Sequence, residues 1–207
     1  MSKKTLVNIL SKLKKFEKPK IRYEQYTTNT DLAGELLWNL HMSHDIQGKT
    51  VIDLGCGPGI LGIGCMLLGA KELIFIDVDK AALDVLRENL QYIDDEFEHD
   101  TKISIENKDV TFIKEDDYSC DIVVQNPPFG TKNAGTDMLF VKKGLAIANY
   151  VLTIHKTSTK NFVRNYFFEN KHKIMFEKNY SFPLKNTMDN HQKEVTRIDV
   201  TGFIIKS

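Results

Sequence analysis

The segment Asn126-Pro127-Pro128-Phe129 follows a short apolar run, residues 122–125, and could hold a planar amine. Two consecutive prolines cannot extend a strand ladder or enter a helix interior, so they stiffen the backbone after the run. The side-chain oxygen of Asn126 and the carbonyl oxygen of Pro127 would be preset acceptors for two amine N–H groups. Phe129 could stack on the ring that carries the amine, at about 1–3 kcal/mol per base. The motif predicts methyl transfer to an exocyclic amine by positioning and electrostatics, without a strong general base. The alternative is a rigid turn over a buried Phe129.

A glycine-rich motif lies upstream, at residues 53–59, with the sequence Asp-Leu-Gly-Cys-Gly-Pro-Gly. It follows an apolar β-branched run and precedes a helix pattern, so free helix N–H groups and closely approaching backbone would meet a ligand there. Asp77 ends the next apolar run, where a carboxylate can accept hydrogen bonds from ribose hydroxyls. The glycines are spaced more tightly than in a pyrophosphate loop. Together with Asp53, they suit the zwitterionic amino acid part of S-adenosylmethionine. The glycines concerned are Gly55, Gly57 and Gly59. The alternative is an ordinary strand-to-helix turn.

Asp109 follows a third strand pattern, residues 103–106. In a doubly wound sheet, ligands bind beyond the carboxyl ends of the strands. Asp109 could therefore accept a hydrogen bond from the adenine amine of the cofactor. The alternative is a simple turn residue.

Strand and helix patterns alternate along most of the chain, which predicts an α/β fold. We expect a doubly wound, Rossmann-like sheet with helices on both faces. The expected strands are 50–54, 73–77, 103–106, 122–124 and 150–154, with 173–180 and 195–205 alternating like antiparallel strands. The expected helices are 4–15, one from Thr30 as N-cap, 60–68, 81–90, 137–149 and 158–169.

The bulk properties indicate one domain, residues 1–207, in which residues 1–45 close over the cofactor and residues 50–207 form the sheet core. With 42% hydrophobic residues and no apolar run long enough to span a membrane, we expect a cytoplasmic protein. The three cysteines form no Cys-x-x-Cys pair, so no metal site is expected. Lys plus Arg and Asp plus Glu both number 28, and the net charge is zero. Nucleic acid could still bind if the charge is segregated.

These motifs resemble class I methyltransferases that modify amino groups. More closely, they resemble the methyltransferase-like protein 5 family of small-subunit ribosomal RNA adenine-N6 methyltransferases, with its archaeal relatives. The resemblance covers nearly the whole chain and is most specific at residues 126–132 with 135–137. It includes Phe16-Glu17-Lys18-Pro19-Lys20, Tyr23-Glu24-Gln25-Tyr26 with Thr28, residues 53–57 and His155-Lys156. Two departures are Pro58, where the vertebrate member has cysteine, and the less basic stretch 190–193.

The resemblance implies a seven-stranded sheet whose last strand is antiparallel. It also implies methyl transfer to the N6 amine of adenine in RNA, with S-adenosylmethionine as cofactor. The residues expected around the cofactor are Gln25, Tyr26, Thr28, Asp53, Gly55, Gly57, Pro58, Gly59, Ile60, Asp77, Val78, Asp109, Val110 and Asn126. The expected substrate contacts are Phe129, Lys132, His155 and Lys156, with a structural His155 as the alternative.

Other functions remain open at this point. A protein glutamine or a DNA adenine also presents a planar amine, although Phe129 and the short chain disfavour glutamine. A nicotinamide-dependent dehydrogenase is disfavoured by the glycine spacing. A non-catalytic nucleotide-binding scaffold is the alternative from another class.

The strand expected at residues 102–107 would lie at a sheet edge, where free N–H and C=O groups can pair with another chain. Ile103 and Ile105 lie on one side of it, and no proline interrupts it. Family members bind a small zinc-binding activator protein along this edge, so we expect a one-to-one heterodimer. The alternative is that a loop of the chain itself covers the edge.

Overall fold

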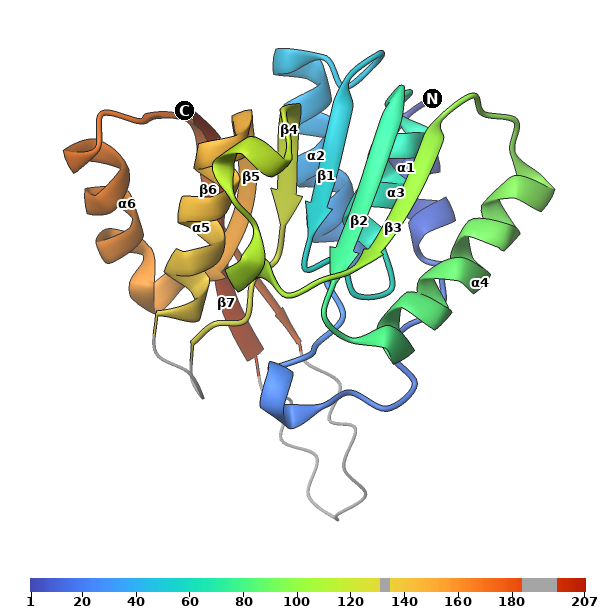
Figure 1. Cartoon of the computed structure of the whole chain (residues 1–207), viewed down its shortest axis with the longest axis horizontal. Helices are drawn as coiled ribbons and strands as arrows, with labels where there is room; N and C mark the ends of the chain where they lie inside the picture. The colour runs from blue at the N-terminus through green and yellow to red at the C-terminus, as the bar shows by residue number, and fades with distance from the viewer. Residues whose placement is uncertain (131–134, 184–196) are drawn as a thin grey trace.

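The computed structural model describes residues 1–130, 135–183 and 197–207, and its centre is a seven-stranded sheet (Figure 1). The strand order is β3-β2-β1-β4-β5-β7-β6. All neighbouring pairs up to β5 are parallel, whereas β7 runs antiparallel to both β5 and β6. The predicted fold class, with seven strands and an antiparallel last strand, is therefore confirmed. The strands are β1 Thr50–Leu54, β2 Glu72–Asp77, β3 Lys102–Asn107, β4 Cys120–Gln125, β5 Ala148–Lys156, β6 Lys173–Pro183 and β7 Arg197–Lys206.

Helices cover both faces of the sheet, as predicted. The apolar residues of α1, α2, α3 and α4 form a core with one face, and those of α5 and α6 form a second core with the other. The helices are α1 Lys3–Leu10, α2 Thr30–His44, α3 Ile60–Leu67, α4 Lys80–Glu96, α5 Thr136–Ile147 and α6 Lys160–Glu169. Short 3-10 helices are η1 Ile21–Tyr23, η2 Val110–Phe112, η3 Glu115–Asp117 and η4 Thr157–Thr159.

The central strands are apolar on both sides because both faces are covered. In β1, Val51 belongs to the first core and Ile52 to the second, and neither side chain is exposed to solvent. The edge strand β3 is only partly buried along its middle. Burial of the strands therefore decreases from the centre of the sheet to its edge, which explains why β1 has a continuous apolar pattern and β3 an alternating one.

Some element boundaries differ from the sequence expectations. The first helix ends at Leu10, five residues earlier than predicted, and Ser11 is its C-cap. The N-cap of α2 is Asn29, whose side chain accepts from the backbone of Asp31 and Leu32, so the assignment of this role to Thr30 is wrong. Asparagine is among the strongest N-cap residues, and it satisfies two free N–H groups here.

The N-terminal helices join the sheet through a close contact between α2 and α3. Leu37 is fully buried. A Cβ atom on Gly64 would lie only 2.3 Å from the Cδ1 atom of Leu37. A side chain at position 64 would therefore force the Leu37 side chain to move. Among the described residues, no helix is long and apolar enough to cross a lipid bilayer.

We predict that Leu37→Ala lowers the free energy of unfolding by about 2–5 kcal/mol, because it opens a cavity between α2 and α3. Met42→Ala on the same helix is the matched control. Met42 is 69% exposed, so this change should stay within about 0.5 kcal/mol. Urea denaturation of both variants measures the difference. Equal losses would show that α2 does not depend on this contact.

Candidate active site

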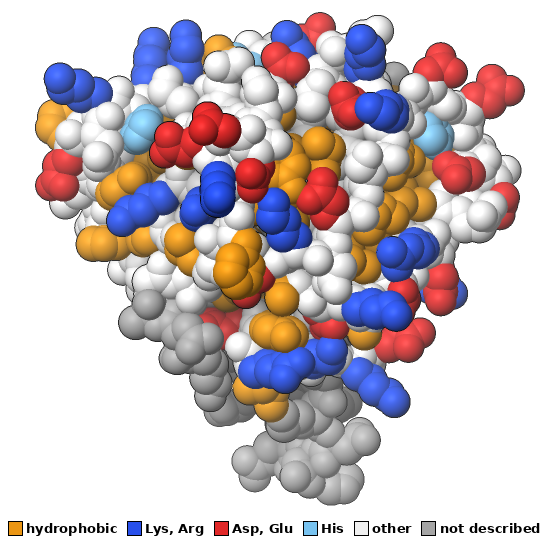
Figure 2. All heavy atoms as spheres, in the orientation of Figure 1, with side chains coloured by type: hydrophobic (Ala, Val, Ile, Leu, Met, Phe, Trp, Pro, Cys, Tyr) orange, Lys and Arg blue, Asp and Glu red, His pale blue; other side chains and the backbone are white. Residues whose placement is uncertain are grey.

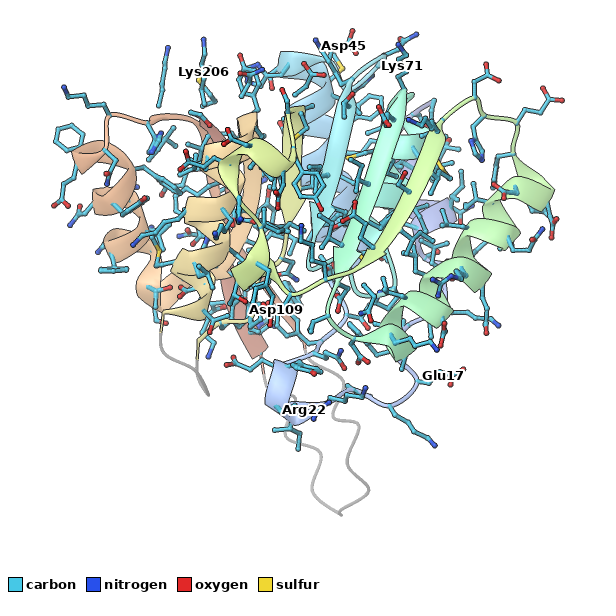
Figure 3. All side chains as sticks on the ribbon, in the orientation of Figure 1. Glu17, Arg22, Asp45, Lys71, Asp109 and Lys206 are labelled. Atoms are coloured by element: carbon cyan, nitrogen blue, oxygen red, sulfur yellow. The ribbon has the colours of Figure 1, made fainter. Side chains whose placement is uncertain are left out.

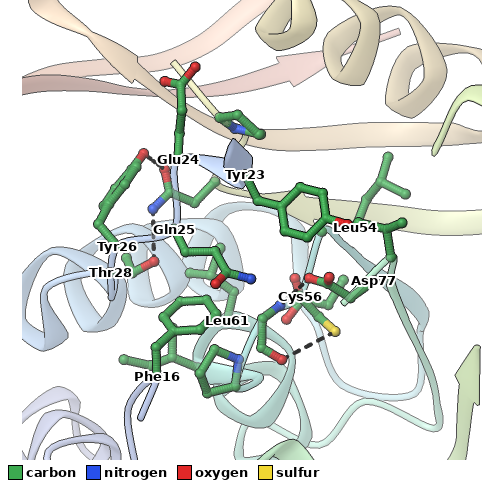
Figure 4. A pocket seen from close by; sticks show the side chains of 18 of the residues that line it. Phe16, Tyr23, Glu24, Gln25, Tyr26, Thr28, Leu54, Cys56, Leu61 and Asp77 are labelled. Atoms are coloured by element: carbon green, nitrogen blue, oxygen red, sulfur yellow. Dashed lines mark hydrogen bonds between the residues drawn. The ribbon is translucent and has the colours of Figure 1, made fainter. Parts of the chain in front are cut away.

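A pocket of about 380 Å³ lies beyond the carboxyl ends of β1, β2 and β4, the side on which ligands bind in open α/β sheets. Its volume is in the range of small-molecule sites. Figure 3 places Asp109 and Arg22 at this end of the molecule, and Asp45, Lys71 and Lys206 at the opposite end. Figure 4 shows Gln25, Tyr26 and Thr28 on one side of the pocket, with Cys56 and Asp77 on the other.

The glycine loop bends back so that two of its N–H groups, those of Gly55 and Cys56, donate to the carbonyl of Ile76 at 2.8 and 3.1 Å. Gly57 has a φ of +53°, and a Cβ there would lie 2.6 Å from the ring of Phe16. A side chain would therefore be strained and would collide with the N-terminal segment. The loop is thus fixed from β2 on one side and from Phe16 on the other.

Asp53 lies at the floor of the pocket and is 1% exposed. Its Oδ2 accepts from the backbone N–H of Gly62 in the first turn of α3, at 2.7 Å. Burial raises the pKa of Asp53 to about 7, although the hydrogen bond from Gly62 opposes this shift. A cation in the pocket would favour the charged carboxylate.

Asp77 holds the loop as well as facing the pocket. Its Oδ2 accepts from Gly57 N at 2.8 Å, and its Oδ1 accepts from Asp79 N at 2.7 Å. Burial raises the pKa of Asp77 against these hydrogen bonds. Asp109 caps η2 by accepting from Thr111 N at 2.8 Å, and it also lines the pocket.

The segment between α1 and α2 crosses the pocket and is tied down by two residues that the sequence did not single out. Asp79 accepts from Lys20 Nζ at 2.5 Å and from Gln25 Nε2 at 2.8 Å. Burial would raise the pKa of Asp79, but the hydrogen bonds from Lys20 and Gln25 outweigh it and lower the pKa. Asn89 on α4 bridges the backbone of Lys14 and the carbonyl of Pro58.

The Asn126 side chain is oriented by its neighbours. Its Nδ2 donates to Thr28 Oγ1 at 2.9 Å, and its Oδ1 accepts from the hydroxyl of Tyr26 at 2.8 Å. The same hydroxyl lies 3.4 Å from the carbonyl oxygen of Pro127. The ring of Tyr26 stacks on Phe129, with centroids 4.7 Å apart. The two predicted acceptors therefore converge on one point beside an aromatic ring.

Of the predicted substrate residues, one lies beside Phe129, one is buried, and one is outside the described residues. Lys156 has its Nζ 5.4 Å from the centroid of Phe129, a cation–π contact. His155 is only 1% exposed; its Nε2 is 2.9 Å from Thr153 Oγ1, and its Nδ1 is 3.6 Å from Asp137 Oδ2. The His155 side chain is thus buried against α5, which favours the structural alternative over direct contact with a substrate. Lys132 lies outside the described residues, as does the stretch 190–193.

The structure brings almost all of the expected cofactor residues to one pocket. The residues that line it are Gln25, Tyr26, Thr28, Asp53, Gly55, Gly57, Pro58, Ile60, Asp77, Val78, Asp109, Val110 and Asn126. Gly59 is the exception: it caps α3 with a φ of +89°, and a Cβ there would meet Leu86 at 2.3 Å. Within the described part of the chain, no group of His, Cys, Asp and Glu side chains could hold a metal ion.

Comparisons with known proteins agree with this geometry. Residues 27–173 match the model of the methyltransferase small domain. An uncharacterized protein of Methanocaldococcus jannaschii is 34% identical over the whole chain and 94% of its own length. The rRNA N(6)-adenosine-methyltransferase METTL5 of Danio rerio is 41% identical over 79% of each chain.

A solved structure agrees as well. The crystal structure of PH1948 from Pyrococcus horikoshii superposes with a TM-score of 0.85 at 36% identity, covering 99% of this chain and 98% of that one. The resemblance inferred from the motifs is thereby confirmed. The chain belongs to the methyltransferase small domain family, and its relatives include METTL5 of Danio rerio and archaeal proteins of similar length.

Proposed function

We propose that this protein transfers a methyl group from S-adenosylmethionine to the N6 amine of adenine in RNA, with small-subunit ribosomal RNA as the substrate. The observation that carries the proposal is the convergence of Asn126 Oδ1 and the Pro127 carbonyl on one hydrogen-bond donor, beside the ring of Phe129. This is the arrangement that an amine with two N–H groups on a flat ring requires. The relative METTL5 of Danio rerio is named for the same reaction on rRNA.

The residues present fit S-adenosylmethionine. Asp77 ends β2 where ribose hydroxyls would lie, and Asp109 lies near the adenine position beyond β3. Asp53, at the pocket floor, would face the ammonium group. The positive charge of the cofactor offsets the cost of burying Asp53 and Asp77 as carboxylates.

The chemistry needs one electron-pair donor, the amine nitrogen. S-adenosylmethionine supplies a methyl group on a positively charged sulfur. Asn126 and Pro127 hold the two N–H groups and aim the nitrogen lone pair, and Thr28 keeps the Asn126 oxygen turned towards them. As the N–C bond forms, the S–C bond breaks and its electron pair stays on sulfur. The nitrogen then releases one proton through these acceptors to water. Positioning and electrostatics supply the catalysis.

RNA would approach over a surface of mixed charge. Figure 2 shows acidic and basic side chains interspersed on this face, with Lys and Arg side chains both along its upper edge and towards its lower end. Arg22 belongs to that end of the molecule and stacks over Tyr23 at 4.5 Å. We expect phosphate contacts here, with an affinity that falls as salt rises. The three cysteines are buried free thiols, which fits our proposal of a reducing compartment such as the cytoplasm.

The N-terminal 45 residues act, in our proposal, as the part of the single domain that closes over the cofactor. Supporting this, Phe16 packs on Gly57, Gln25 is fixed by Asp79, and Thr28 is bonded to Asn126. The segment thus touches both the glycine loop and the amine acceptors.

A zinc-binding activator subunit on β3 remains part of the proposal. β3 is the sheet edge, and Lys102 and Lys108 donate their N–H groups to carbonyls of Lys71 and Asp77, towards β2. Because N–H groups alternate between the two sides of a strand, those of Ile103 and Ile105 point away from β2. They are available to a strand added by a partner.

Asn126→Ala should abolish methyl transfer to RNA, because one amine acceptor is lost. Asn170→Ala, at the end of α6 and far from the pocket, is the control and should retain activity. We would measure transfer of a radiolabelled methyl group to small-subunit rRNA from a deletion strain, and identify the product nucleoside by mass spectrometry. A DNA oligonucleotide and a glutamine peptide serve as competing acceptors. Full activity of Asn126→Ala, or a product other than N6-methyladenosine, would contradict the proposal.

Binding of S-adenosylmethionine should release a proton near neutral pH. Burial raises the pKa of Asp53 to about 7, so the free enzyme carries a proton there below that pH. A bound cation favours the carboxylate and lowers this pKa, so affinity should weaken as pH falls from 7 to 6. Calorimetry in buffers of different ionisation enthalpy counts the protons. Asp53→Asn should bind more weakly and show a smaller pH slope; an equal slope would remove Asp53 from the linkage.

Ile105→Pro should prevent the heterodimer with the host's small zinc-binding activator while leaving the chain folded. Proline is tolerated where a strand N–H faces outward. Ser104→Pro is the matched control, because its N–H points to β2 and its loss should unfold the edge. Co-expression followed by size-exclusion chromatography and a thermal melt distinguishes the two. Separate elution of the wild-type proteins would end the partner proposal.

A further inference from the structure

Tyr26 makes the same contacts that the proposed reaction assigns to the target base. Its hydroxyl donates to Asn126 Oδ1 at 2.8 Å and lies 3.4 Å from Pro127 O. These oxygens are the two acceptors for the N6 amine. The hydroxyl therefore takes the position beside the two oxygens that the amine would need.

The ring of Tyr26 also takes the stacking position. It lies on Phe129 with centroids 4.7 Å apart and planes inclined by 30°, within the spacing of an offset aromatic stack. A gap of this size leaves no room for a third ring. A base that stacks on the same face of Phe129 must therefore displace Tyr26.

We propose that Tyr26 occupies the subsite of the target adenine in the free enzyme, and that the base enters by exchanging with it. This inference rests on the proposed function, because it takes its acceptors from that reaction. Tyr26 is a positioning residue in this scheme: it keeps Asn126 and Phe129 in their working orientation, and it leaves when a ring with a better pair of donors arrives.

The surrounding segment favours a rotation of the side chain over an opening of the chain. Gln25 on one side is held by Asp79, and Thr28 on the other is bonded to Asn126. The backbone on both sides of Tyr26 is thus tied to the site. Burial raises the pKa of Tyr26, so the phenol stays a neutral hydrogen-bond donor throughout the physiological range, as an amine does.

The exchange provides selectivity. A base replaces Tyr26 without loss only if it has two N–H donors for the two acceptors and a flat face for Phe129. A keto base such as uracil, with an oxygen in place of the amine, would leave Asn126 Oδ1 facing another acceptor.

Tyr26→Phe tests the exchange, because it removes the hydroxyl and keeps the ring. We expect the Kd for RNA, measured with the demethylated cofactor product bound, to fall about three- to tenfold, the equivalent of one hydrogen bond that no longer has to be broken. The KM for RNA should fall with it, and kcat should change less. The probe is in vitro transcribed small-subunit rRNA of the source organism. Tyr92→Phe, on α4 outside the pocket, is the matched control and should change neither constant.

Tyr26→Leu separates exchange from an alternative in which Tyr26 stacks on the bound base. In the exchange, this variant binds RNA at least as tightly as the wild type, because its smaller side chain leaves the subsite more easily. Unchanged RNA affinity in Tyr26→Phe together with weaker binding in Tyr26→Leu would overturn the inference. If the wild type methylates adenine, such a result affects Tyr26 alone. If the wild type methylates no adenine, the proposed function fails and the inference fails with it.

Discussion

The parallel pairing of β4 with β1 is the constraint on which the site depends. In this register Asp53 lies opposite Val124, so the glycine loop and Asn126 emerge side by side although about 70 residues separate them in sequence. β2 on the other side of β1 adds Asp77 at the same level. A register shift between β1 and β4 would move the amine acceptors away from the pocket while leaving each motif intact. The buried apolar faces of both strands fix this register.

The site also depends on negative charge that no neighbouring cation among the described residues compensates. Asp53 is buried and Asp77 is partly buried, and loss of solvation raises the pKa of both. The nearby ammonium of Lys20 is engaged with Asp79 and leaves them uncompensated. A pocket of this kind favours a ligand with positive charge, which distinguishes it from a pyrophosphate-binding pocket on a similar sheet.

Much of the site could be predicted because its residues follow strand ends in short, stiff motifs. The glycine loop, Asp77 and Asn126 each stand directly after an apolar run, and parallel strands bring such positions together. Asp79 and Asn89 could not be predicted, because their partners on the N-terminal segment are distant in sequence. Asp79 in addition has the ordinary appearance of a helix N-cap.

Two further differences have a local cause. A strand end in the sequence does not reveal where the side chain of His155 points, and in the structure this side chain is buried beside Asp137 of α5 and the ring of Phe203. The apolar spacing predicts a first helix up to residue 15 because Leu13 continues it; Leu13 is indeed buried, but outside the helix.

The N-terminal segment that follows this helix has a consequence for the order in which ligands bind. Phe16 and Gln25 line the pocket that S-adenosylmethionine would fill, and contacts with Gly57 and Asp79 hold them there, so in our proposal the cofactor has to pass this segment on entry and exit. In our proposal this layout favours an order in which the cofactor binds before RNA and its demethylated form leaves last.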